Sequence, residues 1–247
     1  MADRDAPRAW RTVLDRIEAD LTRGALRPGD RLPGERELAA RLGVGRSSVR
    51  EALRVLDVMG VIRTASGSGP AAGAMIVAAP ADGLAALLRL QAAAQAFPVD
   101  DVVATRLVLE SAVVETLAAA GADLAPASAL FEAMSQPGLS TADFLALDAR
   151  FHHALAEASG NAVTATIMSG LRSAIETYTR AGAERLPDWE GTAVRLQAEH
   201  AAVLDAVRSG DAAAARDRIR AHITGYHAQV RAALGDDDRV AVAPART

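Results

Sequence analysis

The chain has 247 residues, of which 50% are hydrophobic and only 3% are aromatic. This length suits two modest domains or one large one. Abundant alanine with few aromatic residues favours packed helices over a sheet. Cysteine is absent, which excludes disulfides, thiolate metal sites and thiol nucleophiles.

The net charge of −4 is distributed unevenly, because residues 1–75 carry +3 and residues 76–247 carry −7. A basic N-terminal part on an acidic remainder favours a polyanionic partner for the first part only. The first ten residues mix acids and bases without an apolar stretch, so we expect no signal peptide. The apolar run 84–97 is short and contains Arg89, so we expect no membrane span and a cytoplasmic protein.

The first predicted helix covers residues 9–23, where apolar residues recur at helical spacing before a stop at Gly24. Residues 34–60 predict two short helices around a tight turn at 43–45. A Gly/Ser/Pro-rich turn over 66–73 then separates "VIRT" from "AMIV", which indicates a two-stranded wing. This order of elements is that of a winged helix-turn-helix.

The second of the two short helices has the features of a recognition helix. Its apolar residues face inward and leave Arg46, Ser47, Ser48 and Arg50 exposed at its start. A recognition helix reads bases with its N-terminal end, and arginine reads guanine through a bidentate contact. The alternative is a helical hairpin whose arginines are merely solvated.

From residue 84 to about 234 the pattern is helical, with breaks near 97, 123–126, 137, 159, 182–187 and 209. It predicts six or seven helices in an antiparallel all-α bundle. The predicted organisation is therefore a mainly α protein with a DNA-binding domain over 1–77, a linker over 78–83, a bundle over 84–234 and a loose tail over 235–247.

Three of the five histidines fall on inward stripes of predicted helices. Asp148 and His152 lie one turn apart on one helix, and His200 and His222 lie on two others. His153 and the fifth, His227, fall off these stripes, so we expect them to be solvated. A single inward histidine is more often a hydrogen-bonded core residue. Three buried histidines beside a carboxylate each need a hydrogen-bond or metal partner. One divalent metal ion would provide a partner for all four side chains.

The stretch "PGDRLPGERELAARLGVGRSSVREALRVLDVMGVI" closely resembles the DNA-binding domain of the GntR family of bacterial transcription regulators, over about residues 8–77. The resemblance implies that Arg36, Arg46 and Arg50 contact DNA, with Ser47 and Ser48 beside them. The sequence departs from the family in having Gly45 where relatives often carry a hydroxyl residue, and Gly34 where they usually carry a capping Ser or Thr. Its wing is also richer in alanine.

The C-terminal part resembles the FCD ligand-sensing domain of the FadR subfamily, through "RLVLESAVVETLAAA", "DARFHHALAEASGN", "EHAAVLDAVRSGDAAAA" and "AHI". The resemblance implies that Asp148, His152, His200 and His222 hold a metal. It also implies that Arg106 points at the effector. The residues alone leave another role open for Arg106, an ion pair with Glu110 one turn later, and both can hold at once.

We therefore expect a homodimeric DNA-binding regulator, a repressor by analogy with the family, that binds a short inverted repeat in double-stranded DNA. A small carboxylate effector would act at one divalent metal ion per chain, zinc first, with nickel, manganese or iron as alternatives. One competing hypothesis is the same regulator with a purely structural metal. A metal-dependent enzyme is a more distant one, because the inward residues offer no second catalytic acid or base.

Overall fold

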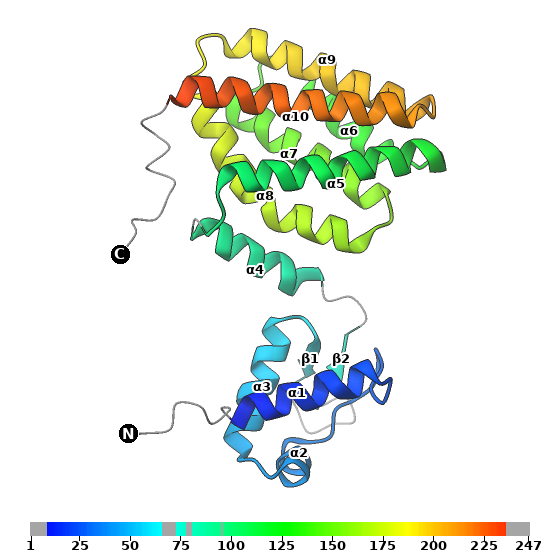
Figure 1. Cartoon of the computed structure of the whole chain (residues 1–247), viewed down its shortest axis with the longest axis vertical. Coiled ribbons are helices and arrows are strands. Elements are labelled where there is room, and N and C mark those ends of the chain that lie inside the picture. Colours follow the sequence, from blue (N-terminus) through cyan, green and yellow to red (C-terminus); the bar gives the residue numbers. More distant parts are fainter. Residues whose placement is uncertain (1–8, 66–72, 78–80, 95, 236–247) are drawn as a thin grey trace. The chain divides into compact units, whose positions relative to one another are not determined.

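The computed structural model describes residues 9–65, 73–77, 81–94 and 96–235. The chain divides between Leu84 and Ala85 into two compact units, each described by itself below (Figure 1). Three of the predicted segments lie partly or wholly outside the described residues. They are the turn of the wing (66–72), residues 78–80 of the linker, and the tail from 236 onward.

The N-terminal unit is a winged helix-turn-helix, as predicted. It contains α1 (Ala9–Thr22), α2 (Glu35–Leu42) and α3 (Arg46–Val58), followed by the antiparallel strands β1 (Ile62–Ala65) and β2 (Gly73–Ile76). The tight turn between α2 and α3 depends on Gly43, whose φ of 64° lies in the left-handed region that glycine adopts without strain. Its backbone N–H caps α2 by donating to the carbonyl of Ala39.

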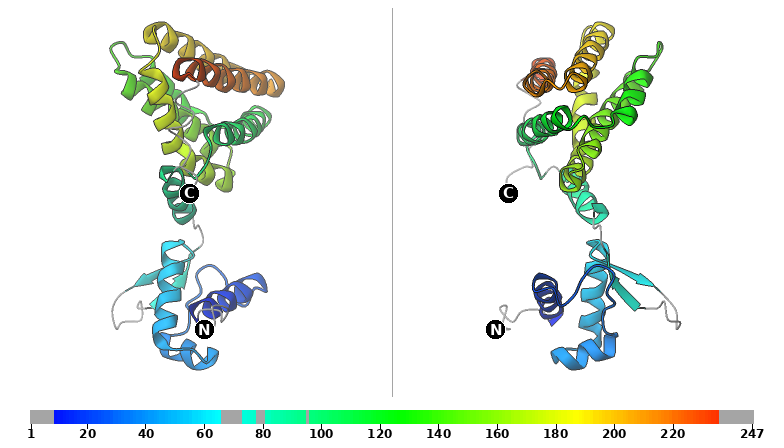
Figure 2. Two further views of the ribbon diagram at one scale, coloured as in Figure 1. Left: turned by 60° about the vertical axis from the view of Figure 1, so that its left-hand side comes forward. Right: turned by 90° about the vertical axis from the view of Figure 1, so that its right-hand side faces the viewer.

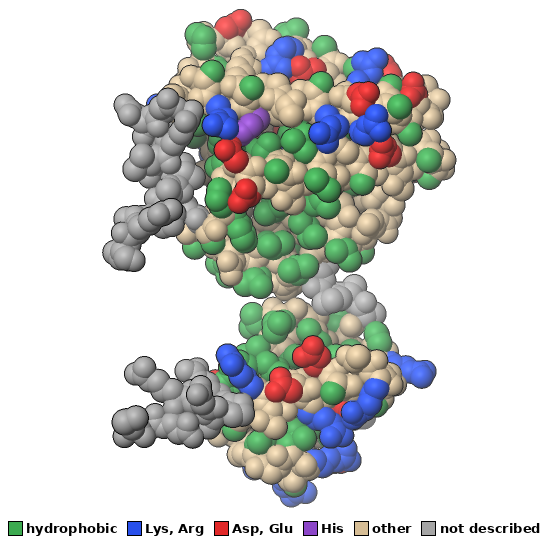
Figure 3. Space-filling view, in the orientation of Figure 1, with side chains coloured by type: hydrophobic (Ala, Val, Ile, Leu, Met, Phe, Trp, Pro, Cys, Tyr) green, Lys and Arg blue, Asp and Glu red, His purple; other side chains and the backbone are tan. Residues whose placement is uncertain are grey.

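The core of this unit lies where α1, α3 and the two strands meet. Val13 and Ile17 of α1 pack with Val49 of α3 and Ile62 of β1, and all four are at most 2% exposed. Burial of one face of α3 leaves its opposite face, with the polar start of the helix, in solvent. On the face seen in Figure 3, arginine side chains gather in a patch on this unit.

The C-terminal unit is an all-α bundle, as predicted. Its helices are α4 (Ala81–Ala93), which begins before the boundary, α5 (Val99–Ala120), α6 (Ala125–Met134), α7 (Thr141–Ala158), α8 (Ala162–Ala183), α9 (Trp189–Arg208) and α10 (Ala212–Leu234). The helices end within a few residues of the breaks that the sequence predicts. Figure 2 shows the helices of this unit packed together from two further directions. The last four begin at side-chain caps, Ser140, Asn161, Asp188 and Asp211, each of which accepts a backbone N–H three residues on.

One large core and a smaller cluster of Val102, Leu171 and Ile175 hold this bundle together. The most deeply buried side chains of the large core, each at most 1% exposed, include Phe151 and Leu155 of α7, Leu196 and Leu204 of α9 and Ile219 of α10. Because these residues flank the inward histidines on the same helices, the core fixes where the histidines point. Among the described residues, no helix is long and apolar enough to cross a membrane.

Candidate functional site

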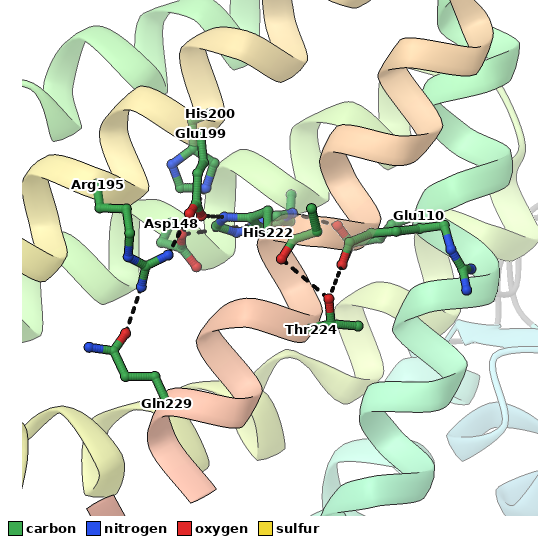
Figure 4. A network of polar contacts seen from close by, with 11 residues as sticks. Glu110, Asp148, Arg195, Glu199, His200, His222, Thr224 and Gln229 are labelled. Atoms are coloured by element: carbon green, nitrogen blue, oxygen red, sulfur yellow. Dashed lines mark hydrogen bonds and ion pairs between the residues drawn. The ribbon is translucent and has the colours of Figure 1, made fainter. Parts of the chain in front are cut away.

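The four predicted metal ligands lie together inside the C-terminal unit. Asp148 and His152 come from α7, His200 from α9 and His222 from α10, and one ligand atom from each lies within 4.8 Å of the others. All four residues are buried, and His200 is completely inaccessible. Figure 4 shows Asp148, His200 and His222 gathered between the helices, with Glu110 and Glu199 approaching from different sides.

Two carboxylates set the orientation of two of the imidazole rings. Glu110 of α5 lies 2.5 Å from Nδ1 of His152, and Glu199 of α9 lies 2.8 Å from Nδ1 of His222. A carboxylate can only accept, so in the neutral rings Nδ1 carries the hydrogen and Nε2 presents its lone pair. The two Nε2 atoms face each other at 3.3 Å. Facing lone pairs repel, unless a proton or a metal ion lies at that point.

His200 supplies an independent sign of a missing partner. Within the described part of the chain neither of its ring nitrogens makes a hydrogen bond, although both are buried. Its Nε2 lies 3.1 Å from a carboxylate oxygen of Asp148, close enough for both atoms to share one ion. A buried nitrogen without a partner costs free energy. The donor set of one carboxylate and three imidazoles fits a divalent transition metal, which would give one ring nitrogen of His200 a partner.

The charges around the cluster keep its carboxylates ionised and one of its rings neutral. Burial opposes ionisation of Glu110, but the charges of Arg106 and His152 outweigh it and lower the pKa of Glu110 to about 2. Burial likewise opposes ionisation of Asp148, yet the neighbouring histidines hold its pKa well below the usual range. Burial and then the neighbouring His200 lower the pKa of His222 to about 4. These are the protonation states that metal ligands need.

Arg106 forms the ion pair with Glu110 that the sequence offered, and its side chain also lies on the wall of a cavity. Its Nε donates to Glu110 at 2.7 Å in a buried ion pair, and the cavity has a volume of about 570 Å³. Ile223, which follows His222, and Tyr226 also line this cavity. The cavity therefore adjoins the metal-ligand cluster, although the four ligands are not among its lining residues.

Four other residues take positions that the sequence did not predict. The sequence suggested Glu110 only as an ion-pair partner of Arg106 and suggested no role for Glu199. In the structure each of these carboxylates contacts a histidine of the cluster. The expectation that His227 is solvated is wrong. Its side chain is only 16% exposed, lines the cavity and meets Tyr178. His153 is also partly buried, at 26% side-chain exposure. Helical periodicity alone carried no signal for these contacts between helices.

The predicted DNA-contacting residues lie at the starts of α2 and α3. Arg36 is the second residue of α2, and Arg46 and Arg50 lie one turn apart at the start of α3; all three are exposed. Ser47 is exposed and Ser48 is partly buried. One carboxylate oxygen of Glu35 lies 3.4 Å from Nε of Arg50 and 3.9 Å from a terminal nitrogen of Arg46. Such exposed pairs are weak and can be exchanged for phosphate or base contacts.

Two family descriptions match the chain, one for each unit. Residues 10–71 match "Bacterial regulatory proteins, gntR family", and residues 101–225 match the FCD domain. The second match covers the region that contains Arg106 and all four clustered ligands.

Relatives similar over most of their length are also regulators. The chain is 30% identical to the HTH-type transcriptional repressor NanR of Citrobacter rodentium (strain ICC168), over 91% of this chain and 88% of that one. It is 31% identical to the HTH-type transcriptional regulator LutR of Bacillus subtilis (strain 168), over 81% and 91%. It is also 29% identical to an Escherichia coli (strain K12) protein provisionally named L-lactate dehydrogenase operon regulatory protein. That alignment covers 89% of this chain and 85% of the relative.

A solved structure shares the fold. The Streptococcus agalactiae GntR structure aligns with 90% of this chain and 100% of its own, with a TM-score of 0.55 and 24% sequence identity. The matched families and these relatives are transcription regulators and not enzymes. The chain therefore belongs to the GntR family of bacterial regulatory proteins, as a transcription regulator with an FCD domain in its C-terminal unit.

Proposed function

We propose that this regulator binds an inverted-repeat operator as a homodimer and that a small organic acid, bound at the metal centre, controls that binding. The observation that carries the proposal is the convergence of three histidine rings and the Asp148 carboxylate at one buried point. Nε2 of His152 faces Nε2 of His222 at 3.3 Å, and both nitrogens of His200 lack hydrogen bonds among the described residues. One divalent ion per chain, zinc first and nickel, manganese or iron next, would complete this donor set.

The bound ion would supply positive charge and Lewis acidity toward an oxygen ligand. The protein contributes the four donors, holds the rings of His152 and His222 through Glu110 and Glu199, and excludes bulk water by burial. Arg106 adds a second positive group on the cavity wall. Charge-assisted hydrogen bonds to a guanidinium favour a carboxylate. The name of the Escherichia coli relative, which refers to L-lactate dehydrogenase, supports a hydroxy acid as the class to test first.

At the other end of the chain, Arg46 and Arg50 would enter the major groove with the start of α3, and Arg36, Ser47 and Ser48 would contact the DNA beside them. A two-fold operator follows from a two-fold dimer. The acid can change DNA binding only if it binds the DNA-free and DNA-bound forms unequally. The repressor activity named for the NanR relative supports a repressor that the acid releases.

A purely structural metal is the second candidate, because one observation favours it: the four ligands do not line the cavity. In that case the acid would meet Arg106 but not the ion. The two candidates differ in how acid binding responds when the metal is removed.

The decisive experiment uses full-length protein purified without added metal. Elemental analysis should find one divalent ion per chain in the wild type and in His153→Ala, and none in the His200→Ala, His222→Ala double variant. A thermal-shift screen of organic acids, before and after chelation, should then find L-lactate or a related hydroxy acid that stabilises only the metal-loaded protein. The same acid should weaken binding to an inverted-repeat operator.

Full metal occupancy in the double variant would contradict the assignment of the ligands. If the acid still stabilises the protein after chelation, the ion has a structural role and does not bind the acid. Hits that are neutral or cationic, or that bind equally well to Arg106→Ala, would overturn the carboxylate mechanism.

A further inference from the structure

The cavity beside the metal-ligand cluster is large and mostly apolar. Its volume is about 570 Å³, within the range of roughly 300–1,000 Å³ that pockets for drug-sized ligands occupy. Phe97, Val99, Val103, Ile175 and Leu234 form much of its wall. An acid of three or four carbons would leave most of this apolar wall without a partner. Such a small ligand would therefore gain little free energy from burial of apolar surface.

A pair of polar side chains lies on the same wall as these apolar residues. The hydroxyl of Tyr178, on α8, lies 2.7 Å from Nδ1 of His227, on α10. Nε2 of His227 lies 3.2 Å from the carboxylate of Asp100, in the first turn of α5, and Arg231 contacts the same carboxylate. These contacts join three helices around one part of the cavity wall.

The direction of these hydrogen bonds decides what the pair can recognise. The carboxylate of Asp100 must accept, so a neutral His227 carries its hydrogen on Nε2. The Tyr178 hydroxyl then donates its hydrogen either to Nδ1 of His227 at 2.7 Å or to the backbone carbonyl of His227 at 3.2 Å. The single hydrogen of the Tyr178 hydroxyl is therefore used within the protein. Its oxygen still has a lone pair that can accept a hydrogen bond from a ligand. Tyr178 is thus suited to accept from a ligand hydroxyl or amine.

We propose that the effector is an organic acid with an apolar, aromatic-sized body, held by its carboxylate near Arg106 and carrying a hydrogen-bond donor that reaches Tyr178. This inference rests on the proposed function and specifies the class of its ligand. Arg106, Tyr178 and the apolar residues that would hold the body line the same cavity.

Three acids with one head group test this directly: L-lactate, L-3-phenyllactate and L-3-(4-hydroxyphenyl)lactate. Isothermal titration of each into metal-loaded, full-length protein should give the weakest binding for L-lactate. Burial of the phenyl ring should tighten binding by roughly 10- to 100-fold. The 4-hydroxyl should tighten it by a further several-fold, about the effect of one hydrogen bond.

Two variants and a matched control test whether the expected increases in affinity arise in the cavity. Ala174→Phe places a ring on the cavity wall and should abolish the advantage of phenyllactate over lactate. Ala162→Phe, on the exposed start of the same helix and outside the cavity wall, should leave it unchanged. Tyr178→Phe should remove only the preference for the 4-hydroxyl compound. Thermal unfolding of each variant without ligand reports whether it has folded.

Equal affinity for L-lactate and phenyllactate would overturn the inference, as would Ala162→Phe acting like Ala174→Phe. An unchanged 4-hydroxyl preference in Tyr178→Phe would overturn the role of the tyrosine. If the ranking of the three acids holds but none of them alters operator binding, the proposed function fails while the ligand class stands. If none of the three binds but another organic acid stabilises the metal-loaded protein, the inference fails while the proposed function stands.

Discussion

Glu110 supports the candidate metal centre without being one of its four predicted ligands. Its two carboxylate oxygens contact two different groups, one the Nε of Arg106 and the other Nδ1 of His152. It therefore fixes the tautomer of one metal-ligand histidine and also positions the arginine on the cavity wall. Carboxylates that hold metal-bound histidines in this way raise ligand basicity and metal affinity.

Glu110→Gln should therefore weaken metal binding by about 10- to 100-fold, because the amide lacks the charge that holds His152 and Arg106. Chelator competition on full-length protein measures the affinity. Glu115→Gln is the matched control, since this carboxylate on the same helix is 39% exposed and pairs with Arg216 away from the cluster. Equal metal affinity in wild type and Glu110→Gln would contradict the role given to Glu110.

The protonation of His222 makes a prediction about pH. In the folded, metal-free protein its pKa lies near 4, below the ordinary value of 6.5, because burial and then His200 disfavour the charged ring. As the pH falls from about 6.5 to 4, the unfolded chain takes up a proton that the folded chain does not, so the free energy of unfolding decreases. The loss should be at most about 3 kcal/mol for this group.

The lowered pKa values of Asp148 and Glu110 add a further loss of stability below about pH 4, where their unfolded forms become protonated. Urea unfolding of chelator-treated protein between pH 8 and pH 3.5 measures the whole profile. The decrease between pH 6.5 and 4 should be smaller in His222→Gln. A profile that rises toward acid pH would contradict these assignments.

The start of α3 should control DNA affinity through Arg46 and Arg50, which the turn at Gly43 leaves exposed. Arg46→Ala should cost about 1–3 kcal/mol in operator binding if it contacts a base, and should relax specificity at one position. If it contacts a phosphate, all sequences should weaken evenly and the salt slope should fall by about 1. Arg41→Ala, at the end of α2 and paired with Glu37, is the control.

Operator binding in fluorescence anisotropy, repeated at several salt concentrations, separates these two outcomes. Wild-type affinity in both Arg46→Ala and Arg50→Ala would show that the start of α3 is not the recognition surface.

The close approach of α8 and α10 depends on Gly182. A Cβ built at this position would lie 2.3 Å from a methyl carbon of the fully buried Val230, so an added methyl group must displace that side chain. Gly182→Ala should cost about 1–3 kcal/mol of stability through overpacking. Gly225→Ala is the control, because position 225 is an exposed helical site with no neighbour within 4 Å. This control should gain about 0.5–1 kcal/mol.

Denaturant unfolding of both glycine variants tests this prediction. If Gly182→Ala is as stable as Gly225→Ala, the two helices can separate without cost.

Metal binding should stabilise the packing of three helices that are far apart in the sequence. The ligands come from α7, α9 and α10, so a bound ion closes long loops of the chain and stabilises only the folded arrangement. Hydrogen exchange in the full-length protein should slow in these three helices when zinc is added to chelator-treated protein. The α2 and α3 helices belong to a separate compact unit and serve as the internal control. Equal slowing in α2 and α3 would contradict a local effect.

By itself, the sequence determined the elements, their order and the residues that face inward. The breaks at 97–98, 137–138, 159–160 and 209–210 and the turn at 43–45 fall where helices end in the structure. Turn and capping chemistry is local, as is the 3.6-residue repeat, so both can be read from neighbouring residues. The same repeat placed Asp148 and three histidines on buried faces, and their chemistry predicted a shared partner.

Only the tertiary structure decided how those residues meet. Glu110 contacts a histidine 42 residues away, and Tyr178 contacts another 49 residues away. The position of one helix face against another fixes both contacts. The sequence placed His227 in solvent because it falls off the inward stripe of its helix that holds His222, whereas α5 and α8 supply its partners. The cavity likewise has walls from several helices, and packing between remote segments, not local periodicity, sets its size and lining.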